Sequence, residues 1–135
     1  MHTLYTDGGS RGNPGDSAIG FFIFDEQMKL VDFGGKYLGI VTNNNAEYKA
    51  LIEGLKLAIK NKIKKLKCVL DSELVVKQIN GLYKISSPEI KIDATKVMDL
   101  RKEFDEISFN HVLRSENKFA DKLVNIILDT KQKNA

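Results

Sequence analysis

Residues 3–15 read TLYTDGGSRGNPG, and this stretch decides how the chain begins to fold. Residues 3–7 have the composition of a β-strand, and that strand ends in the carboxylate of Asp7. Residues 8–15 are rich in glycine, asparagine and proline, so we predict a loop there. Asp7 is therefore expected at the junction of an apolar strand and a glycine-rich loop, where packing alone favours an apolar residue.

The next two segments continue a sheet. Residues 19–24 are nearly all apolar, as expected of a strand that is covered on both faces. Residues 25–27 (DEQ) suit a hairpin turn, and a third strand is predicted over about residues 29–36.

Beyond residue 42 the pattern changes to helices that alternate with strands. Thr42 and the asparagines after it can cap a helix. Apolar residues then recur with the helical period of about 3.6, at Tyr48, Leu51, Ile52, Leu55, Ala58 and Ile59. The remaining predicted elements are a strand at 66–70, helices at about 73–80 and 88–105, a strand at 107–113, and a last helix with an apolar stripe from Ala120 to Leu128. This order predicts the α/β class, with helices packed on a mixed sheet.

Length and composition indicate a single domain. The chain has 135 residues, and we expect the domain at 1–130 and a short polar tail at 131–135. No apolar run approaches the ~20 residues that a membrane helix needs, and a strand follows Met1 too closely for a signal peptide. The lone Cys68 and the two histidines form no disulfide or zinc pattern. We expect a cytoplasmic monomer with no membrane association and no obligate protein partner.

Four carboxylates occupy positions where packing favours apolar side chains. Asp7 ends the first strand, and Asp71 ends the fourth. Glu47 extends the apolar stripe of the first helix toward its N-terminus, and Asp121 flanks the stripe of the last helix. One such carboxylate is usually a helix cap or half of an ion pair, but four in one chain indicate a shared site.

A shared carboxylate site favours divalent cations. Without them the charges would repel one another and raise the pKa values of the group. Oxygen ligands suit Mg²⁺ or Mn²⁺ better than zinc. Two such ions about 4 Å apart are a known device for phosphodiester hydrolysis. The residues alone therefore predict phosphoryl chemistry, and the net charge of +3 permits a phosphate-bearing partner without requiring one.

Four segments resemble the sequence motifs of type 1 ribonuclease H. They are residues 6–15 (TDGGSRGNPG), 42–51 (TNNNAEYKAL), 71–75 (DSELV) and 114–123 (RSENKFADKL). Their carboxylates follow the catalytic order of that family, Asp, Glu, Asp, Asp. Four motifs in order over nearly the whole chain are far more specific than any one of them, and the small archaeal and bacterial branch is the nearer match.

The resemblance implies a five-stranded mixed sheet in the order 3-2-1-4-5, flanked by helices. It also implies hydrolysis of the RNA strand of an RNA–DNA hybrid, giving 5′-phosphate and 3′-hydroxyl ends. Asp7 would bridge two Mg²⁺ ions, with Mn²⁺ as a substitute, and Glu47, Asp71 and Asp121 would complete their coordination. Glu47 would also accept a hydrogen bond from a ribose 2′-hydroxyl, the group that distinguishes RNA from DNA.

Further residues are expected to contact the substrate. Arg114, at the end of the last strand, is placed to contact the scissile or leaving phosphate. Lys84 is a candidate for a contact with the DNA backbone. The remaining substrate-binding candidates, taken from the matching motifs, are Gly8, Gly9, Ser10, Asn13, Thr42, Asn43, Asn44, Ser72, Glu73 and Asn117. Among them, Gly9, Ser10 and Asn13 would line the RNA strand. Asn13, Thr42 and Asn44 would hold a phosphate or the minor-groove edge of the DNA strand.

The chain departs from the family pattern in three places. Glu73 stands where many members carry a glutamine that can touch a base. The segment between Asp71 and the last strand lacks a strongly basic protrusion, and the short loop before Asp121 lacks a histidine. A run of lysines between residues 56 and 67 is interpreted as a solvated face rather than a nucleic-acid patch, because it lies at the far end of the first helix.

Two other functions have to be weighed against this one. A catalytically silent nucleic-acid-binding module could use the same fold, although the complete set of carboxylates argues against it. Another nuclease of the superfamily is the second alternative. A proofreading exonuclease would carry Asp-x-Glu on its first strand, where this chain has Asp7-Gly8-Gly9. A transposase or integrase would end its set in glutamate.

Overall fold

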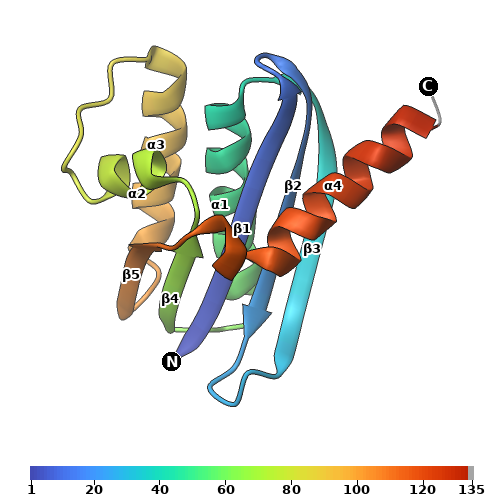
Figure 1. Cartoon of the computed structure of the whole chain (residues 1–135). Coiled ribbons are helices and arrows are strands. Elements are labelled where there is room, and N and C mark those ends of the chain that lie inside the picture. The colour runs from blue at the N-terminus through green and yellow to red at the C-terminus, as the bar shows by residue number, and fades with distance from the viewer. Residues whose placement is uncertain (134–135) are drawn as a thin grey trace.

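The computed structural model describes residues 1–133 and contains one five-stranded sheet in the order β3-β2-β1-β4-β5 (Figure 1). The predicted class and strand order are confirmed. The elements are β1 (His2–Gly12), β2 (Gly15–Phe24), β3 (Leu30–Val41), α1 (Asn43–Lys60), β4 (Lys65–Leu70), α2 (Glu73–Ile79), α3 (Pro88–Arg101), β5 (Glu106–His111), the short 3₁₀ helix η1 (Arg114–Glu116) and α4 (Lys118–Lys133).

The sheet is mixed, with β1 at its centre. Strand β1 is antiparallel to β2 and parallel to β4, while β2–β3 is antiparallel and β4–β5 parallel. The parallel pairing places Thr6 of β1 beside Leu70 of β4. Asp7 and Asp71 therefore follow neighbouring residues at the same level of two adjacent strands, which is the first condition for a shared site.

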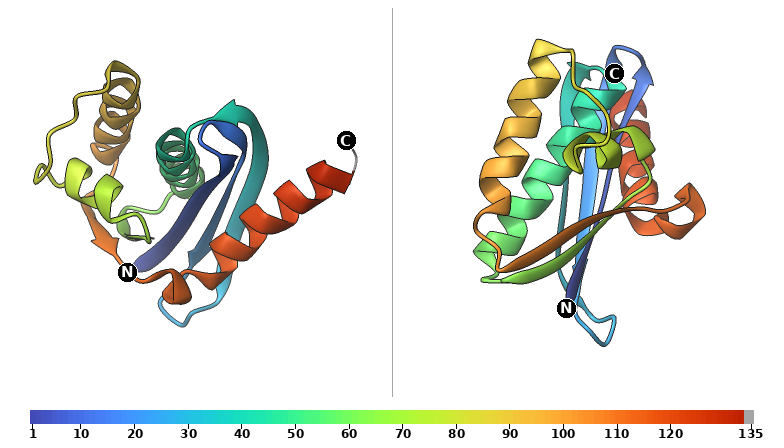
Figure 2. Two further views of the ribbon diagram at one scale, coloured as in Figure 1. Left: turned by 45° about the horizontal axis from the view of Figure 1, so that its top comes forward. Right: turned by 90° about the vertical axis from the view of Figure 1, so that its left-hand side faces the viewer.

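Helices cover the two faces of the sheet unequally. Helices α1 and α3 lie together on one face and α4 lies on the other, as Figure 2 shows. The main core includes Leu4, Ile19, Leu51, Leu55 and Val97. The buried cluster under α4 is much smaller and consists of Ala18, Val124 and Leu128. No helix within residues 1–133 is both long and apolar enough to cross a membrane.

The predicted glycine-rich loop is wrong, because most of it is strand. Strands β1 and β2 form a continuous hairpin whose ladder runs to the pair Gly12 and Gly15, with only Asn13 and Pro14 between the strands. Because glycine has no side chain, the strand can approach a helix closely at these positions. A Cβ atom at Gly8 would overlap the backbone of Ala46 in α1.

Other boundaries shift by a few residues. Strand β2 begins at Gly15 rather than at residue 19, and its added residues pair with an extension of β3 to Val41. Helix α3 ends at Arg101, and β5 ends at His111. Of the expected tail, residues 131–133 continue α4, and residues 134–135 lie outside the described part.

The lysine run lies where the sequence predicted it. Lys60 ends α1, and Lys65 and Lys67 open β4, so all three lie at the end of the sheet away from Asp71, which follows β4.

Candidate active site

Helix α1 brings Glu47 against the central strand. The helix begins after Thr42, whose side chain accepts a hydrogen bond from the backbone N–H of Asn45 over 3.2 Å. Glu47 lies one turn further along and is only 4% exposed. The backbone N–H of Gly8 donates to Oε1 of Glu47 over 2.6 Å. The missing Cβ at Gly8 and this hydrogen bond together fix the helix to the strand.

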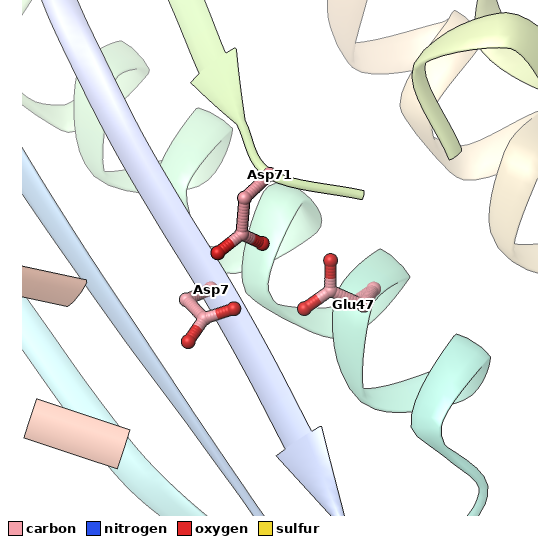
Figure 3. A group of neighbouring side chains, drawn as sticks. All are labelled: Asp7, Glu47 and Asp71. Carbon is pink, nitrogen blue, oxygen red and sulfur yellow. The ribbon is translucent and has the colours of Figure 1, made fainter. Parts of the chain in front are cut away.

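Three of the four predicted carboxylates converge. Asp7 projects from β1, Asp71 from the end of β4 and Glu47 from α1, as Figure 3 shows. Each offers one oxygen, and these oxygens lie within 4.8 Å of one another. The convergence follows from the topology, because β1 and β4 are parallel neighbours and the start of α1 packs on β1 at Gly8.

Asp121 reaches the same cleft from the other face of the sheet. It lies in the first turn of α4, it is half-buried, and it is not part of the closest group of three. Its negative charge nevertheless contributes to the raised pKa of Asp7. The cleft is lined by Asp7, Gly8, Gly9, Ser10, Arg11, Asn43, Glu47, Asp71, Ser72, Arg114, Asp121, Val124, Asn125 and Leu128.

Burial and mutual repulsion make the carboxylates weak acids. Burial raises the pKa of Asp7 far above its usual value, and the charges of Glu47 and Asp71 raise it further. Burial also raises the pKa of Glu47, to about 7, against the opposing hydrogen bond from Gly8. Burial raises the pKa of Asp71 as well, although the nearby Arg114 guanidinium opposes this shift.

The donor set fits hard divalent cations. Its ligands are carboxylate oxygens only, without nitrogen or sulfur. Oδ2 of Asp71 is buried and has no hydrogen-bond partner in the described part of the chain. Its nearest cationic group is Nε of Arg114, at 4.0 Å. A buried anionic oxygen without a donor is costly, and a bound cation would satisfy it.

Arg114 lies at the rim of the cleft. It begins η1, separated from the last strand by two residues, and its side chain is 80% exposed while the side chain of Asp71 is 9% exposed. An exposed guanidinium beside a carboxylate cluster is free to turn toward an anion that enters the cleft.

A second, polar pocket gathers the residues expected to hold the DNA strand. Asn13, Thr42, Asn43 and Asn44 all line it. The side-chain oxygen of Asn13 accepts from the backbone N–H of Asn43 over 3.0 Å, which ties the β1–β2 turn to the start of α1. The pocket also includes Asn45, Ser87, Glu89 and Ile90. The last three open α3, and no local sequence pattern indicated that α3 begins beside α1.

Three predicted substrate contacts lie elsewhere. Glu73 is exposed and forms an ion pair with Lys77 over 2.6 Å. Lys84 is exposed between α2 and α3 and lines neither pocket. The predicted substrate contact of Asn117 is wrong, because this residue is 1% exposed and its side chain cannot reach a substrate. Sequence reasoning also missed Arg11 and Asn125 at the rim of the cleft, since a polar residue on a strand or helix surface has no distinguishing signal.

A mixed sheet in this order, with one carboxylate on its central strand and others converging on it from neighbouring elements, defines the ribonuclease H-like class of folds. The family model described as "Reverse transcriptase-like" matches residues 5–126. Ribonuclease HI of Halobacterium salinarum is 38% identical over 125 residues, which are 93% of this chain and 63% of that protein. A crystal structure of RNase H1 from that archaeon has a TM-score of 0.93 at 37% identity and covers 96% of this chain and 98% of its own.

A second solved structure is similar over its full length. LC11-RNase H1 in complex with an RNA/DNA hybrid has a TM-score of 0.91 at 36% identity, covering 98% of this chain and 99% of that one. The chain belongs to the ribonuclease H family. It spans 63% of the halobacterial relative, and 36% of a bifunctional protein of Mycobacterium tuberculosis that is 35% identical over 133 residues. Those relatives contain sequence beyond the part that this chain matches.

Proposed function

We propose that this chain hydrolyses the RNA strand of RNA–DNA hybrids with two Mg²⁺ ions, leaving 5′-phosphate and 3′-hydroxyl ends. The observation that carries the proposal is the group of Asp7, Glu47 and Asp71, whose oxygens lie within 4.8 Å of one another in an open cleft. Further support comes from LC11-RNase H1, 36% identical to this chain, whose crystal structure contains an RNA/DNA hybrid.

The two pockets suggest how a hybrid would be held. Asn43 lines both of them, so they adjoin at the start of α1. The RNA strand would enter the carboxylate cleft, and the DNA strand would lie on the pocket of Asn13, Thr42 and Asn44. Oε1 of Glu47 accepts from Gly8, which leaves Oε2 for a ribose 2′-hydroxyl. Reading both strands at once would distinguish a hybrid from duplex DNA.

The chemistry would be divided between cations and side chains. Asp7, Glu47, Asp71 and Asp121 would hold the Mg²⁺ ions, with Mn²⁺ as a substitute, and the ions when bound supply an activated water and stabilise the leaving oxygen. Arg114 would pair with a phosphate oxygen, and it cannot act as a base because a guanidinium stays protonated. The partner in this proposal is the hybrid alone, met by a monomer in the cytoplasm.

A substrate comparison tests the proposal. End-labelled RNA–DNA hybrid, double-stranded RNA and double-stranded DNA of one sequence are incubated with the protein, with Mg²⁺ or with chelator. We expect Mg²⁺-dependent cuts within the RNA strand of the hybrid and an intact DNA strand. No cleavage of the hybrid in Mg²⁺, or equal cleavage of the DNA duplex, would overturn the proposal.

A further inference from the structure

Asn117 is a buried polar side chain in an otherwise exposed segment. It lies between η1 and α4, where its neighbours Glu116 and Lys118 are exposed. Asn117 itself is 1% exposed. A polar side chain is seldom buried at such a place unless it makes a specific hydrogen bond.

Three hydrogen bonds connect Asn117 to three parts of the active site. Its side-chain Nδ2 donates to the backbone carbonyl of Thr6 over 2.8 Å, and Thr6 directly precedes Asp7. Its backbone N–H donates to the carbonyl of Arg114 over 3.0 Å, and its own carbonyl accepts from the N–H of Asp121 over 3.2 Å. One residue thus joins β1, η1 and the first turn of α4.

Near Asp121, helix α4 is otherwise held by apolar contacts, with Ala120 and Val124 buried and Phe119 packed on Phe22 and Phe24. Only Ala120, Val124 and Leu128 are buried along its length. Arg11 adds an ion pair with Asp129 at 2.7 Å, two turns away, and a hydrogen bond to Oδ1 of Asn125 at 3.2 Å, one turn away, both of them at the surface. Among the described residues, the amide of Asn117 is the buried hydrogen bond that ties the start of α4 to β1. The other three carboxylates are fixed by the main core and the β1–β4 pairing.

We propose that Asn117 is a positioning residue, whose amide bond to the Thr6 carbonyl sets the separation between Asp121 and Asp7 and so completes the second cation site. This inference rests on the proposed function, since it concerns the same cleft. Asn117 touches neither substrate nor cation. It acts through Asp121, whose helix arrives from the opposite face of the sheet.

The unpaired oxygen of the same amide supports a role beyond packing. Oδ1 of Asn117 is buried and has no hydrogen-bond partner in the described residues. An unpaired buried acceptor destabilises a fold, so an apolar residue would suit this position better if it served packing alone. The donor of the amide must face Thr6, because two facing oxygens would repel each other.

The test compares Asn117→Ala and Asn117→Asp with the matched control Asn110→Ala. Asn110 also donates a side-chain amide to a strand carbonyl, that of Cys68 at 3.1 Å, but it lies on β5 and lines no pocket at the site. Asn117→Asp keeps the shape and replaces the donor with a second acceptor. Two readouts are needed. The first is Mn²⁺ binding by calorimetry without substrate, and the second is hybrid cleavage across Mg²⁺ concentrations.

We expect both Asn117 variants to bind Mn²⁺ about tenfold more weakly, and to need about tenfold more Mg²⁺ for half-maximal cleavage, with KM for the hybrid unchanged. Asn110→Ala should melt at a lower temperature with normal metal dependence. If a folded Asn117 variant shows the wild-type metal dependence in both readouts, the positioning role is refuted.

Two further outcomes distinguish a failure of the positioning role of Asn117 from a failure of the proposed function. If Asn117→Ala does not fold, Asn117→Gln retains the donor on a longer side chain, and it should show an intermediate loss of metal affinity. If that variant binds Mn²⁺ no better than Asn117→Asp, which lacks the donor, the role of the amide is refuted. If the wild-type protein binds Mn²⁺ but does not cut the hybrid, the proposed function fails, while the calorimetric comparison still decides the role of Asn117.

Discussion

At the scale of single residues, the chain keeps negatively charged side chains where burial disfavours their charge. Asp7 is 7% exposed and Glu47 is 4% exposed, and the pKa of each is raised first of all by burial. A carboxyl group with a raised pKa in the folded state stabilises the fold while it is protonated. This stabilisation is complete below the pKa of the unfolded chain and is lost as the pH rises through the folded value.

The pH dependence of metal-free stability follows from these shifts. In chelator, Asp7→Asn should melt at least about 3 °C above the wild type at pH 8, the shift expected for about 1 kcal/mol in a domain of this size. The difference should shrink at pH 5, near the range in which the unfolded carboxylates ionise. The wild type loses this stabilisation over a pH range that begins at about pH 4, where the unfolded carboxylates ionise. The range extends past pH 7, the raised pKa of Glu47, because the pKa of Asp7 is raised even further.

Thermal melts at several pH values measure this effect. Asp105→Asn is the matched control, because Asp105 is an exposed carboxylate outside the cleft. A variant Asp7→Asn that melts below the wild type at pH 8 in chelator would show that the carboxylates do not destabilise one another.

Arg114 gives a second prediction at this scale. Its side chain is 80% exposed, so Arg114→Ala should leave the melting temperature within about 1 °C of the wild type. Turnover of the hybrid should fall by about tenfold to a hundredfold, because a charge-assisted contact with the phosphate is lost. Steady-state kinetics measures the change, and Arg114→Lys should recover only part of it. Unchanged turnover in the alanine variant would show that Arg114 makes no productive contact with the phosphate.

At the scale of elements, the close contact between β1 and α1 determines the position of Glu47. Gly8→Ala would place a Cβ atom against the backbone of Ala46 and displace the helix. We expect a loss of about 2 kcal/mol or more in the free energy of unfolding. Gly9→Ala is the control, because the added atom would meet only a side-chain methyl of Val124, at 3.1 Å. Equal loss of stability in the two variants, measured by denaturant unfolding, would show that the contact at Gly8 is not the constraint.

The same elements show how much the sequence could predict. Periodicity and apolar runs identified most helices and strands, because most have a buried stripe or face, whereas β3, which has no buried residue, was placed by the turn before it. The extensions of β1, β2 and β3 were missed, because Gly8 and Gly12 read as turn residues while the strand pairing that extends all three strands is not local. The residues predicted for the second pocket were incomplete for a similar reason. Ser87 and Glu89 reach this pocket only through the packing of α3 beside α1.

At the scale of the whole molecule, the site depends on elements from both faces of one sheet. The motif order predicted that four carboxylates would meet, and the three on β1, on α1 and just after β4 each offer an oxygen within 4.8 Å of the others. The role of Asn117 could not be predicted from the sequence. A motif residue close to an aspartate of the site suggests substrate contact. Only the burial of Asn117 and its hydrogen bond to Thr6 indicate that it connects the start of α4 to β1.

The proposed role of the Asp7 cluster is to hold the cations that cut RNA. Its most direct test is single-turnover cleavage of an RNA–DNA hybrid in Mg²⁺ by the wild type, by Asp7→Asn and by Asp105→Asn, each shown to be folded by circular dichroism. We predict that Asp7→Asn is slower by about a thousandfold or more, since losing about 4 kcal/mol of transition-state stabilisation lowers a rate by three powers of ten. Asp105→Asn should match the wild type. A folded Asp7→Asn protein within tenfold of the wild-type rate would contradict the account.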